Sequence, residues 1–322
     1  MFKPLASLLA ASVLLMLPSA IAAQQAALPP LIRIVVPAVA GSGTDALARA
    51  VGAQLASRTG SNVIVENKPG ASTMIGSAAV AKGPKDGSML LISTTTLLTT
   101  GAMMKEPMLD VVNDLMPVAM LQQHPLVVAV SIKSNIKTPA ELIAAARAAP
   151  GTITHGSAGT GTIAHVAQVM LEDAAGVKLT HVPYKGTAPA VMDMASGIID
   201  VVIATNATVA PGIRSGRARV IAVTSLQPSP AFPGLPTMAS VAPGFSLDLW
   251  TGFFVSAGTP ALVVKRLNQE INEIAKSDKL REMMTLDGGV PLPLTPDELG
   301  PLMRESFAKF KKLAMDKNIT VE

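Results

Sequence analysis

The amino-acid sequence predicts an α/β protein of two lobes, each built on a mostly parallel β-sheet that is flanked by helices. Short runs of β-branched and other apolar residues alternate with helical segments along the chain, an order typical of right-handed βαβ units. About 300 of the 322 residues follow the N-terminal 22, more than one hydrophobic core usually serves. The same alternation starts again in the middle of the chain, which indicates a second lobe.

The first lobe is predicted to begin with a βαβ unit. A loop over residues 37–43 follows the first β-branched run, and apolar residues then recur at every fourth position (Leu47, Val51 and Leu55). That spacing predicts one apolar face of a helix. The strands expected in this part of the chain span residues 31–36, 62–66 and 89–93.

Three helix starts are marked by their local sequence. Thr138-Pro139-Ala140-Glu141 and Thr295-Pro296-Asp297-Glu298 each place a hydroxyl at the N-cap, proline at the first helical position and glutamate at the third. That combination predicts a capping box. Thr259-Pro260 is expected to begin a further helix that continues toward Lys276.

The middle of the chain supplies the strands of the second lobe. They are expected at residues 126–130, 198–203 and 219–223. The chain is expected to pass between the lobes near residues 119–130 and 219–225. The predicted organisation is residues 23–122 in lobe one, 123–225 in lobe two, and 226–322 returning to lobe one.

Residues 1–22 have the features of a cleaved secretory signal. Lys3 gives a positive start, residues 5–17 form a short apolar run, and Ala20-Ile21-Ala22 has the small-x-small form of a cleavage site. The alternative is a buried N-terminal helix. The chain contains no cysteine, so a lipid anchor at a cysteine is excluded, as are disulfides and thiolate metal sites. We therefore expect an exported, periplasmic protein.

Composition disfavours several classes of function. Lys and Arg total 26 against 22 Asp and Glu, and they are scattered, whereas nucleic-acid binding needs a dense basic patch. Aromatic residues make up only 3% of the chain, too few to stack on a neutral sugar. No HExxH or G-x-S-x-G motif occurs. We expect no catalytic residue, no cofactor and no metal, and we interpret His124, His155, His165 and His181 as structural.

Two loops share the pattern G-x-G-T-x-A. Gly41-Ser42-Gly43-Thr44-Asp45-Ala46 follows the first strand, and Gly159-Thr160-Gly161-Thr162-Ile163-Ala164 lies in the middle of the chain. Each leads into a predicted helix, whose free first-turn amides and dipole suit a carboxylate or phosphate. One such loop in each lobe would hold an anion between them. The alternative is a pair of ordinary strand-to-helix turns.

A dinucleotide-binding enzyme is the main rival interpretation. G-x-G-x-x-A after a strand resembles the dinucleotide fingerprint, and Glu66 ends the next strand, where a ribose-binding acid would lie. Residues 37–40, however, separate the first strand from Gly41, whereas the fingerprint needs a tight turn. Export also takes the chain away from the cytoplasmic cofactor pool.

The chain resembles the Bug-type periplasmic solute-binding proteins of tripartite tricarboxylate transporters. The motifs that carry the resemblance run in order along the mature chain: Ile34-Val35-Val36-Pro37, Val65-Glu66-Asn67-Lys68-Pro69-Gly70-Ala71, Gly156-Ser157-Ala158-Gly159, Ala164-His165 and His181-Val182-Pro183-Tyr184-Lys185-Gly186-Thr187-Ala188-Pro189-Ala190. The sequence departs from the family pattern at Ala38, Ser42, Ser72, Thr73 and Thr205, among others.

The resemblance implies a two-lobed Venus flytrap fold with the ligand between the lobes. It implies a small organic acid as ligand (a di- or tricarboxylate, an acidic amino acid or an aromatic acid) and a two-subunit membrane permease as partner. We expect a monomer, and presentation of the ligand to a sensory receptor remains an alternative to transport. The residues expected at the ligand are Ala38, Val39, Gly41, Ser42, Gly43, Thr44, Asp45, Thr94, Ser157, Gly159, Thr160, Gly161, Thr162, Tyr184, Lys185, Thr205 and Asn206.

Overall fold

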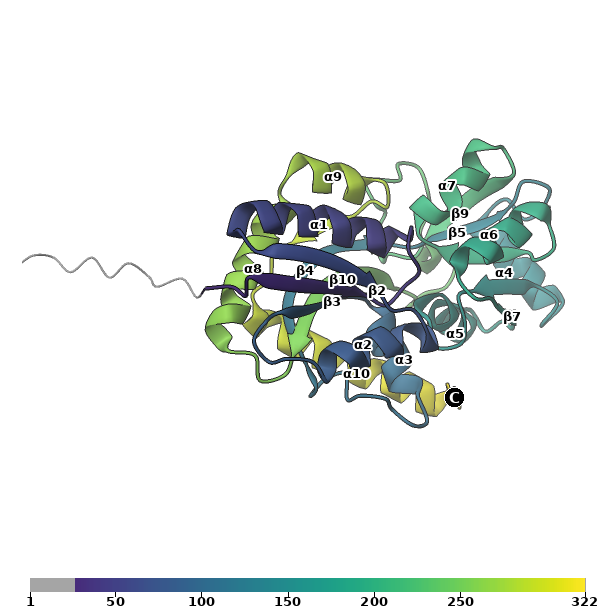
Figure 1. Ribbon diagram of the computed structural model, residues 1–322. Helices are drawn as coiled ribbons and strands as arrows, with labels where there is room; N and C mark the ends of the chain where they lie inside the picture. Colours follow the sequence, from purple (N-terminus) through teal and green to yellow (C-terminus); the bar gives the residue numbers. More distant parts are fainter. Residues whose placement is uncertain (1–26, 322) are drawn as a thin grey trace, which may run out of the picture.

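Two β-sheets, one of six strands and one of five, organise the chain into two lobes that lie side by side (Figure 1). The computed structural model describes residues 27–321, so the predicted signal segment, residues 1–22, lies outside the described residues. Within the described part of the chain, no helix combines the length and the apolar character that crossing a membrane requires.

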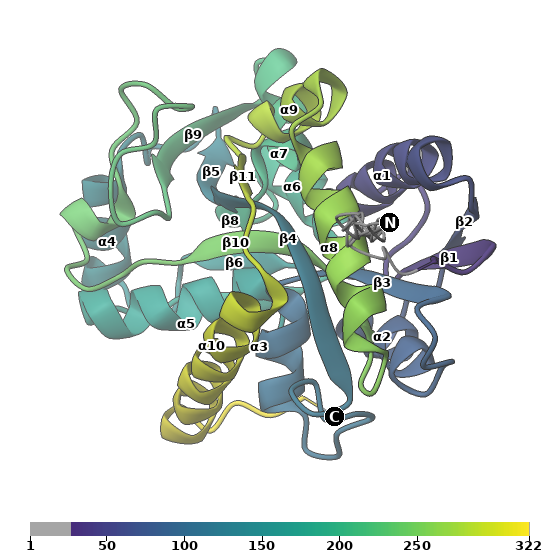
Figure 2. The ribbon, with the colours of Figure 1, turned by 90° about the vertical axis from the view of Figure 1, so that its left-hand side faces the viewer.

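The six-stranded sheet has the order β11-β4-β10-β3-β1-β2. Its strands are β1 (Leu31–Val36), β2 (Asn62–Asn67), β3 (Met89–Thr94), β4 (Leu115–Pro125), β10 (Asp248–Ser256) and β11 (Val290–Leu292). The helices of this lobe are α1 (Gly43–Thr59), α2 (Met74–Ala81), α3 (Thr96–Met103), α8 (Ala261–Ala275), α9 (Asp278–Thr285) and α10 (Pro296–Asp316). Both α8 and α10 contact the long strand β4 (Figure 2).

The five-stranded sheet has the order β7-β6-β8-β5-β9. Its strands are β5 (Val127–Ser131), β6 (Thr154–Ser157), β7 (Thr180–Pro183), β8 (Val201–Ala204) and β9 (Ala218–Val223). The helices around it are α4 (Pro139–Ala148), α5 (Ile163–Ala175), α6 (Thr187–Ser196) and α7 (Asn206–Arg214). Two 3₁₀ turns, Ala71–Thr73 and Met238–Ser240, complete the elements of the described chain.

The two-lobed α/β architecture is confirmed, but both sheets are mixed and not mostly parallel. In the first sheet β1 pairs in parallel with β2 and β3, whereas β10 runs antiparallel to both of its neighbours. In the second sheet β6 pairs in parallel with β7 and β8, whereas β5 runs antiparallel to β8 and β9. Strands that arrive from the other lobe need no helical crossover, so antiparallel pairing is open to them.

The capping boxes form as predicted. The Thr138 hydroxyl accepts a hydrogen bond from the Glu141 amide, and the Glu141 carboxylate accepts one from the Thr138 amide. Thr295 and Glu298 make the same reciprocal pair at the start of α10. By contrast, the strand expected from residue 198 begins only at Val201, because the Asp200 amide donates to the Thr154 hydroxyl and not to a carbonyl of a neighbouring strand.

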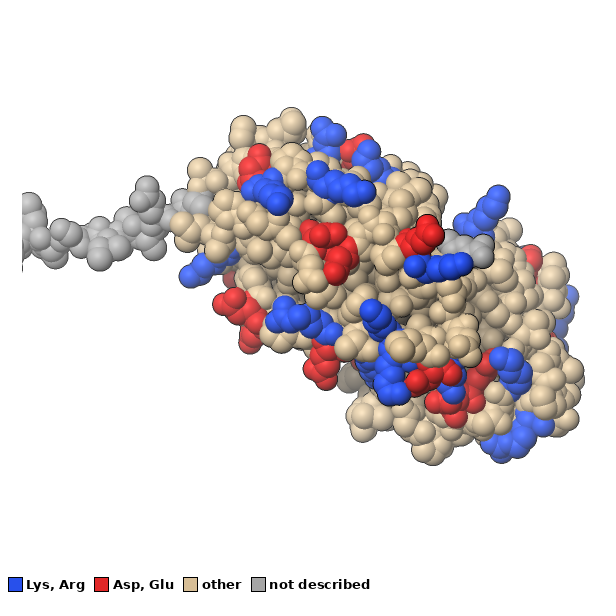
Figure 3. Space-filling view, turned by 90° about the horizontal axis from the view of Figure 1, so that it is seen from below, with Lys and Arg blue, Asp and Glu red and all other residues tan. Residues whose placement is uncertain are grey.

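Apolar packing joins the lobes along one side. A single buried cluster includes Leu97 on α3, Val166 on α5 and Phe310 on α10, so it continues from the first lobe into the second. Two further clusters are local to one lobe each: one lies beneath α1 and α8, and the other beneath α6 and α7. On the face shown in Figure 3, basic and acidic side chains are interspersed.

The chain passes between the sheets at Leu126, the residue that separates β4 from β5. The Thr224 hydroxyl, fully buried just after β9, accepts a hydrogen bond of 2.8 Å from the Leu126 amide. The Thr224 amide in turn donates to the Leu126 carbonyl at 2.9 Å, and the Leu247 amide donates to the Thr224 carbonyl at 3.1 Å. The two connections between the lobes are therefore bonded to each other.

We expect Thr224→Val to lower the free energy of unfolding by about 1–3 kcal/mol, because the buried Leu126 amide loses its acceptor while side-chain volume is kept. Urea denaturation measures the change. Thr285→Val, which removes an exposed hydroxyl bonded to the Arg281 carbonyl, is the matched control and should stay within about 0.5 kcal/mol of wild type. Equal urea midpoints for the two variants would contradict the prediction.

Candidate ligand-binding site

The predicted ligand-contacting residues lie where parallel strands end and the next helices begin. Loops at this edge of an α/β sheet are the usual place for ligands. The connections concerned follow β1 and β3 in the first lobe and β6, β7 and β8 in the second. In Figure 1 the loop between β1 and α1 lies at the edge of the first lobe that faces the second.

The loop before α1 is stabilised by its own side chains. Gly41 has a φ of 82°, and its amide donates to Asp45 Oδ2 at 2.9 Å. Ser42 is the N-cap residue, and its hydroxyl accepts from the Asp45 amide at 3.2 Å. Ala38 and Val39 supply carbonyls that accept from Asn67 Nδ2 and from the Ser42 amide.

The loop before α5 has nearly the same backbone conformation. Gly161 has a φ of 80°, and its amide donates to His165 Nδ1 at 3.2 Å. The N-cap residue Thr162 has φ −68° and ψ 160°, against −69° and 161° for Ser42. Each N-cap amide donates to the carbonyl three residues earlier at 3.3 Å.

The two loops therefore have matching backbone conformations, but the residues that match are not the ones that the shared sequence pattern aligns. The sequence pattern aligns Gly41 with Gly159, whereas the structure makes Gly41 equivalent to Gly161 and Asp45 equivalent to His165. Gly43 is the first residue of α1, while Gly159 lies before the N-cap of α5 with a φ of 128°. Residues of the same type therefore have different backbone conformations in the two loops. The alignment by residue type was wrong by two positions.

The first turns of both helices leave backbone amides free. In the part of the chain that the structure describes, the amides of Gly43 and Thr44 on α1 and of Ile163 and Ala164 on α5 have no hydrogen-bond partner. Ile163 and Ala164 are each only 6% exposed. Thr162 makes no side-chain cap, because its hydroxyl donates to the Gly159 carbonyl instead. A buried helix start without acceptors is unusual and indicates a place for an external one.

The segment over residues 70–76 lies between the two loops. A Cβ atom on Gly159 would stand 3.6 Å from Ser72 Oγ, and one on Gly76 would stand 2.9 Å from the Cβ of Pro37. Ala71, Ser72 and Thr73 all have positive φ (44°, 47° and 87°), a conformation that costs a non-glycine residue roughly 1–2 kcal/mol. Sequence reasoning left this segment out of the site, although it noted Ser72 and Thr73 as departures from the family pattern. No hydrogen bond joins residues 38–45 directly to residues 157–162 among the described residues.

The start of α7 is hydrogen-bonded to residues of the other lobe. Thr205 is the N-cap, and its hydroxyl accepts from the Thr208 amide at 3.3 Å. Asn206 donates through Nδ2 to the Leu286 carbonyl at 2.7 Å, and the Ala207 amide donates to Asp287 Oδ1 at 2.6 Å. Asp287, which the sequence did not single out, thus caps α7 from the lobe opposite.

Three other predicted residues have defined environments. The Tyr184 hydroxyl donates to Asp193 Oδ2 at 2.7 Å, and burial together with this hydrogen bond raises the pKa of Tyr184 to about 12. Lys185 is exposed and makes no ion pair within residues 27–321. The Thr94 hydroxyl accepts from the Thr96 amide at 3.3 Å.

Asp45 is turned toward its own loop. Its side chain accepts from the Gly41 amide, from Asn67 Nδ2 at 3.0 Å and from Arg49 Nε at 3.1 Å. Burial favours the neutral acid, but these donors outweigh it and hold the pKa of Asp45 below its usual value. The carboxylate is therefore neutralised inside the loop.

A histidine cluster lies behind the second loop, and two of its rings, His165 and His181, are hydrogen-bonded to the loop. His155 and His181 are directly paired residues of β6 and β7, and α5 places His165 on His181 with ring centroids 4.1 Å apart. Ser157 Oγ lies within hydrogen-bonding distance of His181 Nε2, at 2.6 Å, and accepts from the Gly159 amide at 3.1 Å. Burial lowers the pKa of His155 to about 3 and that of His165 to about 4, and it lowers the pKa of His181 as well. All three rings are neutral near pH 7.

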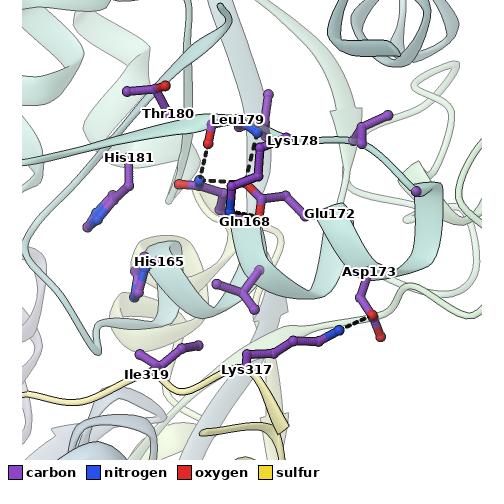
Figure 4. Close-up of a pocket in the computed structure, with 13 residues that line it drawn as sticks. His165, Gln168, Glu172, Asp173, Lys178, Leu179, Thr180, His181, Lys317 and Ile319 are labelled. Atoms are coloured by element: carbon purple, nitrogen blue, oxygen red, sulfur yellow. Dashed lines mark hydrogen bonds and ion pairs between the residues drawn. The ribbon is translucent and has the colours of Figure 1, made fainter. Parts of the chain in front are cut away.

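The outer side of the same cluster borders a surface groove of about 670 Å³ (Figure 4). His165 and His181 lie at one end of it, and Lys317 and Ile319 come from the segment after α10. Lys317 forms an ion pair with Asp173 on α5. In the described part of the chain, no group of three His, Asp or Glu residues is arranged to hold a metal ion.

Comparison with known proteins agrees with this geometry. The fold, with helix starts of two lobes at the carboxyl edges of their sheets, is that of a periplasmic solute-binding protein. The model of the tripartite tricarboxylate transporter family receptor matches residues 47–319, and the chain belongs to that family.

Its relatives and structural neighbours extend over almost the whole chain. A UPF0065 protein in the tcbD-tcbE intergenic region of Pseudomonas sp. strain P51 is 35% identical over 88% of this chain and 84% of its own length. BugT of Bordetella pertussis is 33% identical over 83% of each chain.

Solved structures show the same likeness. The periplasmic binding protein BugD has a TM-score of 0.81 at 29% identity, covering 90% of this chain and 98% of its own. Rpa4515 of R. palustris with adipate has a TM-score of 0.83 at 28% identity, with the same coverage of 90% and 98%. MatC of Rhodopseudomonas palustris with bound malate has a TM-score of 0.79 at 25% identity, covering 88% and 98%.

We expect the free energy of unfolding to fall as pH falls from about 6.5 toward 4. In that window the unfolded chain protonates its histidines near pH 6.5, whereas native His155 and His165, with pKa values of about 3 and 4, do not bind the protons. Urea denaturation at several pH values between 7.5 and 4.5 measures the slope.

His155→Gln should make this slope shallower, because it removes one of the buried titrating groups. Carboxylates such as Asp45, whose native pKa is lowered, begin to lose their stabilising effect only below about pH 5, at the lower end of this window. A free energy of unfolding that is the same at pH 7 and pH 4.5 would be inconsistent with the buried, neutral histidines.

Proposed function

We propose that this protein is a periplasmic solute-binding protein that captures a small organic carboxylate between its two lobes for a tripartite tricarboxylate-type transporter. The unpartnered backbone amides of two buried residues at the start of α5 carry the proposal. Ile163 and Ala164 are each 6% exposed and lack an acceptor in the described chain, and a carboxylate would supply one. The matching start of α1 offers the amides of Gly43 and Thr44 from the other lobe.

The electrostatics of the two loops favour an anion. The partial positive charge at each helix N-terminus attracts a carboxylate, and the local acidic group, Asp45, is already neutralised by Arg49 and Asn67. The histidines behind the second loop are neutral, so they add neither attraction nor repulsion. A ligand with a negative group at each end would meet one helix start in each lobe, as adipate and malate have the chemistry to do.

Capture would couple ligand binding to the position of the lobes. The connections at Leu126 and Thr224 form the crossing between the lobes, and the bonds from α7 to Leu286 and Asp287 join them at a separate point. A dicarboxylate between the lobes would add contacts to both at once and so favour a closed arrangement. We propose residues 23–122 with 226–322 as lobe one, and residues 123–225 as lobe two.

The partner of the liganded form would be a two-subunit membrane permease, which the protein would meet in the periplasm as a monomer. The residues proposed to surround the ligand are those of the loops after β1 and β6, together with the neighbouring connections. Residues 70–76 join this set because Ser72 adjoins Gly159 and Gly76 adjoins Pro37. Asn206 and Tyr184 take part indirectly, since their polar groups are already bonded to Leu286 and Asp193.

A panel of acids tests the proposal by calorimetry and thermal denaturation on the mature protein. Adipate, malate, citrate, aspartate and benzoate are compared with NADH and glucose as controls. At least one acid should bind with a micromolar or lower Kd, and a concentration of about 100 times Kd should stabilise the fold by about 2.7 kcal/mol. Stabilisation by NADH alone, or by no acid, would overturn the proposal.

A further inference from the structure

We infer that His165 is a positioning residue for ligand capture: its Nδ1 holds the Gly161 amide so that the adjoining amides of α5 face the ligand. Gly161 donates to His165 Nδ1 at 3.2 Å, and Gly41 donates to Asp45 Oδ2 at 2.9 Å in the equivalent position of the other lobe. In both loops the acceptor lies four residues after a glycine of positive φ. The same backbone device thus uses two chemically different acceptors.

The hydrogen bond from the Gly161 amide to His165 determines which backbone amides remain free to bind a ligand. If the Gly161 amide turned outward, the peptide planes before Thr162 would rotate and the helix start would lose its alignment. Thr162 does not cap α5 with its side chain, so no other group on α5 replaces this bond. His165 itself is 8% exposed and packs on His181, which is hydrogen-bonded to Ser157 at the start of the same loop. The loop, His165 and His181 therefore form one connected unit.

The choice of histidine makes the second loop sensitive to protons. Nδ1 accepts a hydrogen bond only while it carries no proton. The Asp45 carboxylate has a lowered pKa, so it stays ionised and continues to accept the hydrogen bond from Gly41 in acid. The titratable groups around His165 are His181 on β7, Glu172 on α5 and Lys178 in the following loop, with Lys317 across the groove. The groove in Figure 4 borders both His165 and His181, so protons reach the pair from the outer surface. Protonation of His165, whose pKa is about 4, would break its bond to Gly161 as the pH falls toward that value.

Two variants of His165 separate positioning from packing. In His165→Asn, Oδ1 replaces Nδ1 as the acceptor and does not titrate, whereas His165→Leu fills the space without an acceptor. With adipate as the probe at pH 7.5, calorimetry should give wild-type affinity for His165→Asn. His165→Leu should bind adipate about tenfold more weakly, equivalent to about 1.4 kcal/mol.

The pH profile supplies a readout that a purely structural role would not change. Between pH 7.5 and 4 the affinity of wild type for adipate should fall about twofold more than that of His165→Asn, because about half of the His165 side chains are protonated at a pH equal to their pKa of about 4, whereas protonation of adipate affects both proteins equally. His155→Gln, in the same cluster but bonded to Gln168 and not to the loop, is the matched control and should keep the wild-type profile. Equal affinities of the Asn and Leu variants, or parallel pH profiles for wild type and His165→Asn, would overturn the inference.

Because this role rests on ligand capture between the lobes, a ligand-free measurement keeps the two proposals distinct. Nitrogen-15 NMR should show His165 protonated at Nε2 and not at Nδ1 at pH 7. The Gly161 amide signal should move with the titration of His165 in wild type, stay constant in His165→Asn, and exchange about tenfold faster in His165→Leu. A proton on Nδ1, or unchanged Gly161 exchange in His165→Leu, would refute the positioning role even if no acid binds.

Discussion

The hydrogen bond from a left-handed glycine to a side chain four residues later sets the geometry of both candidate loops. Gly41 and Gly161 adopt φ values of 82° and 80°, which L-residues rarely adopt, and each turns its amide back toward the following helix. With that amide bonded internally, the next residue becomes the N-cap and the first-turn amides point away from the loop. The candidate site therefore depends as much on the backbone amides that are hydrogen-bonded within the loops as on those that remain free for a ligand.

Much of the fold was predictable because its signals are local. The capping boxes at Thr138 and Thr295 each need only residues within one turn, and the β-branched runs at 31–36 and 219–223 are strands by composition alone. The mixed character of the sheets was not predictable from the same runs. Strand direction depends on how the chain returns from the other lobe, and no residue of β5 or β10 encodes it.

The sequence located the two candidate loops but not which of their residues are equivalent. The shared pattern G-x-G-T-x-A located both loops. Gly43 lies inside α1, however, whereas Gly159 precedes the N-cap of α5, so the pattern alone paired the wrong residues of the two loops. The spacing from Gly161 to His165, repeated from Gly41 to Asp45, was the signal that would have found the correct one. His155, His165 and His181 come together only through the β6–β7 register and the packing of α5, which no short motif reveals.

The external groove beside α5 has a consequence for the molecule as a whole. One wall, Lys317 and Ile319, follows α10 of the first lobe, and the other belongs to α5 of the second. A rotation that moves α10 relative to α5 would therefore change the width of this groove and the Lys317–Asp173 ion pair. A ligand that changed the arrangement of the lobes would in this way also change the shape of the solvent-facing surface beside α5.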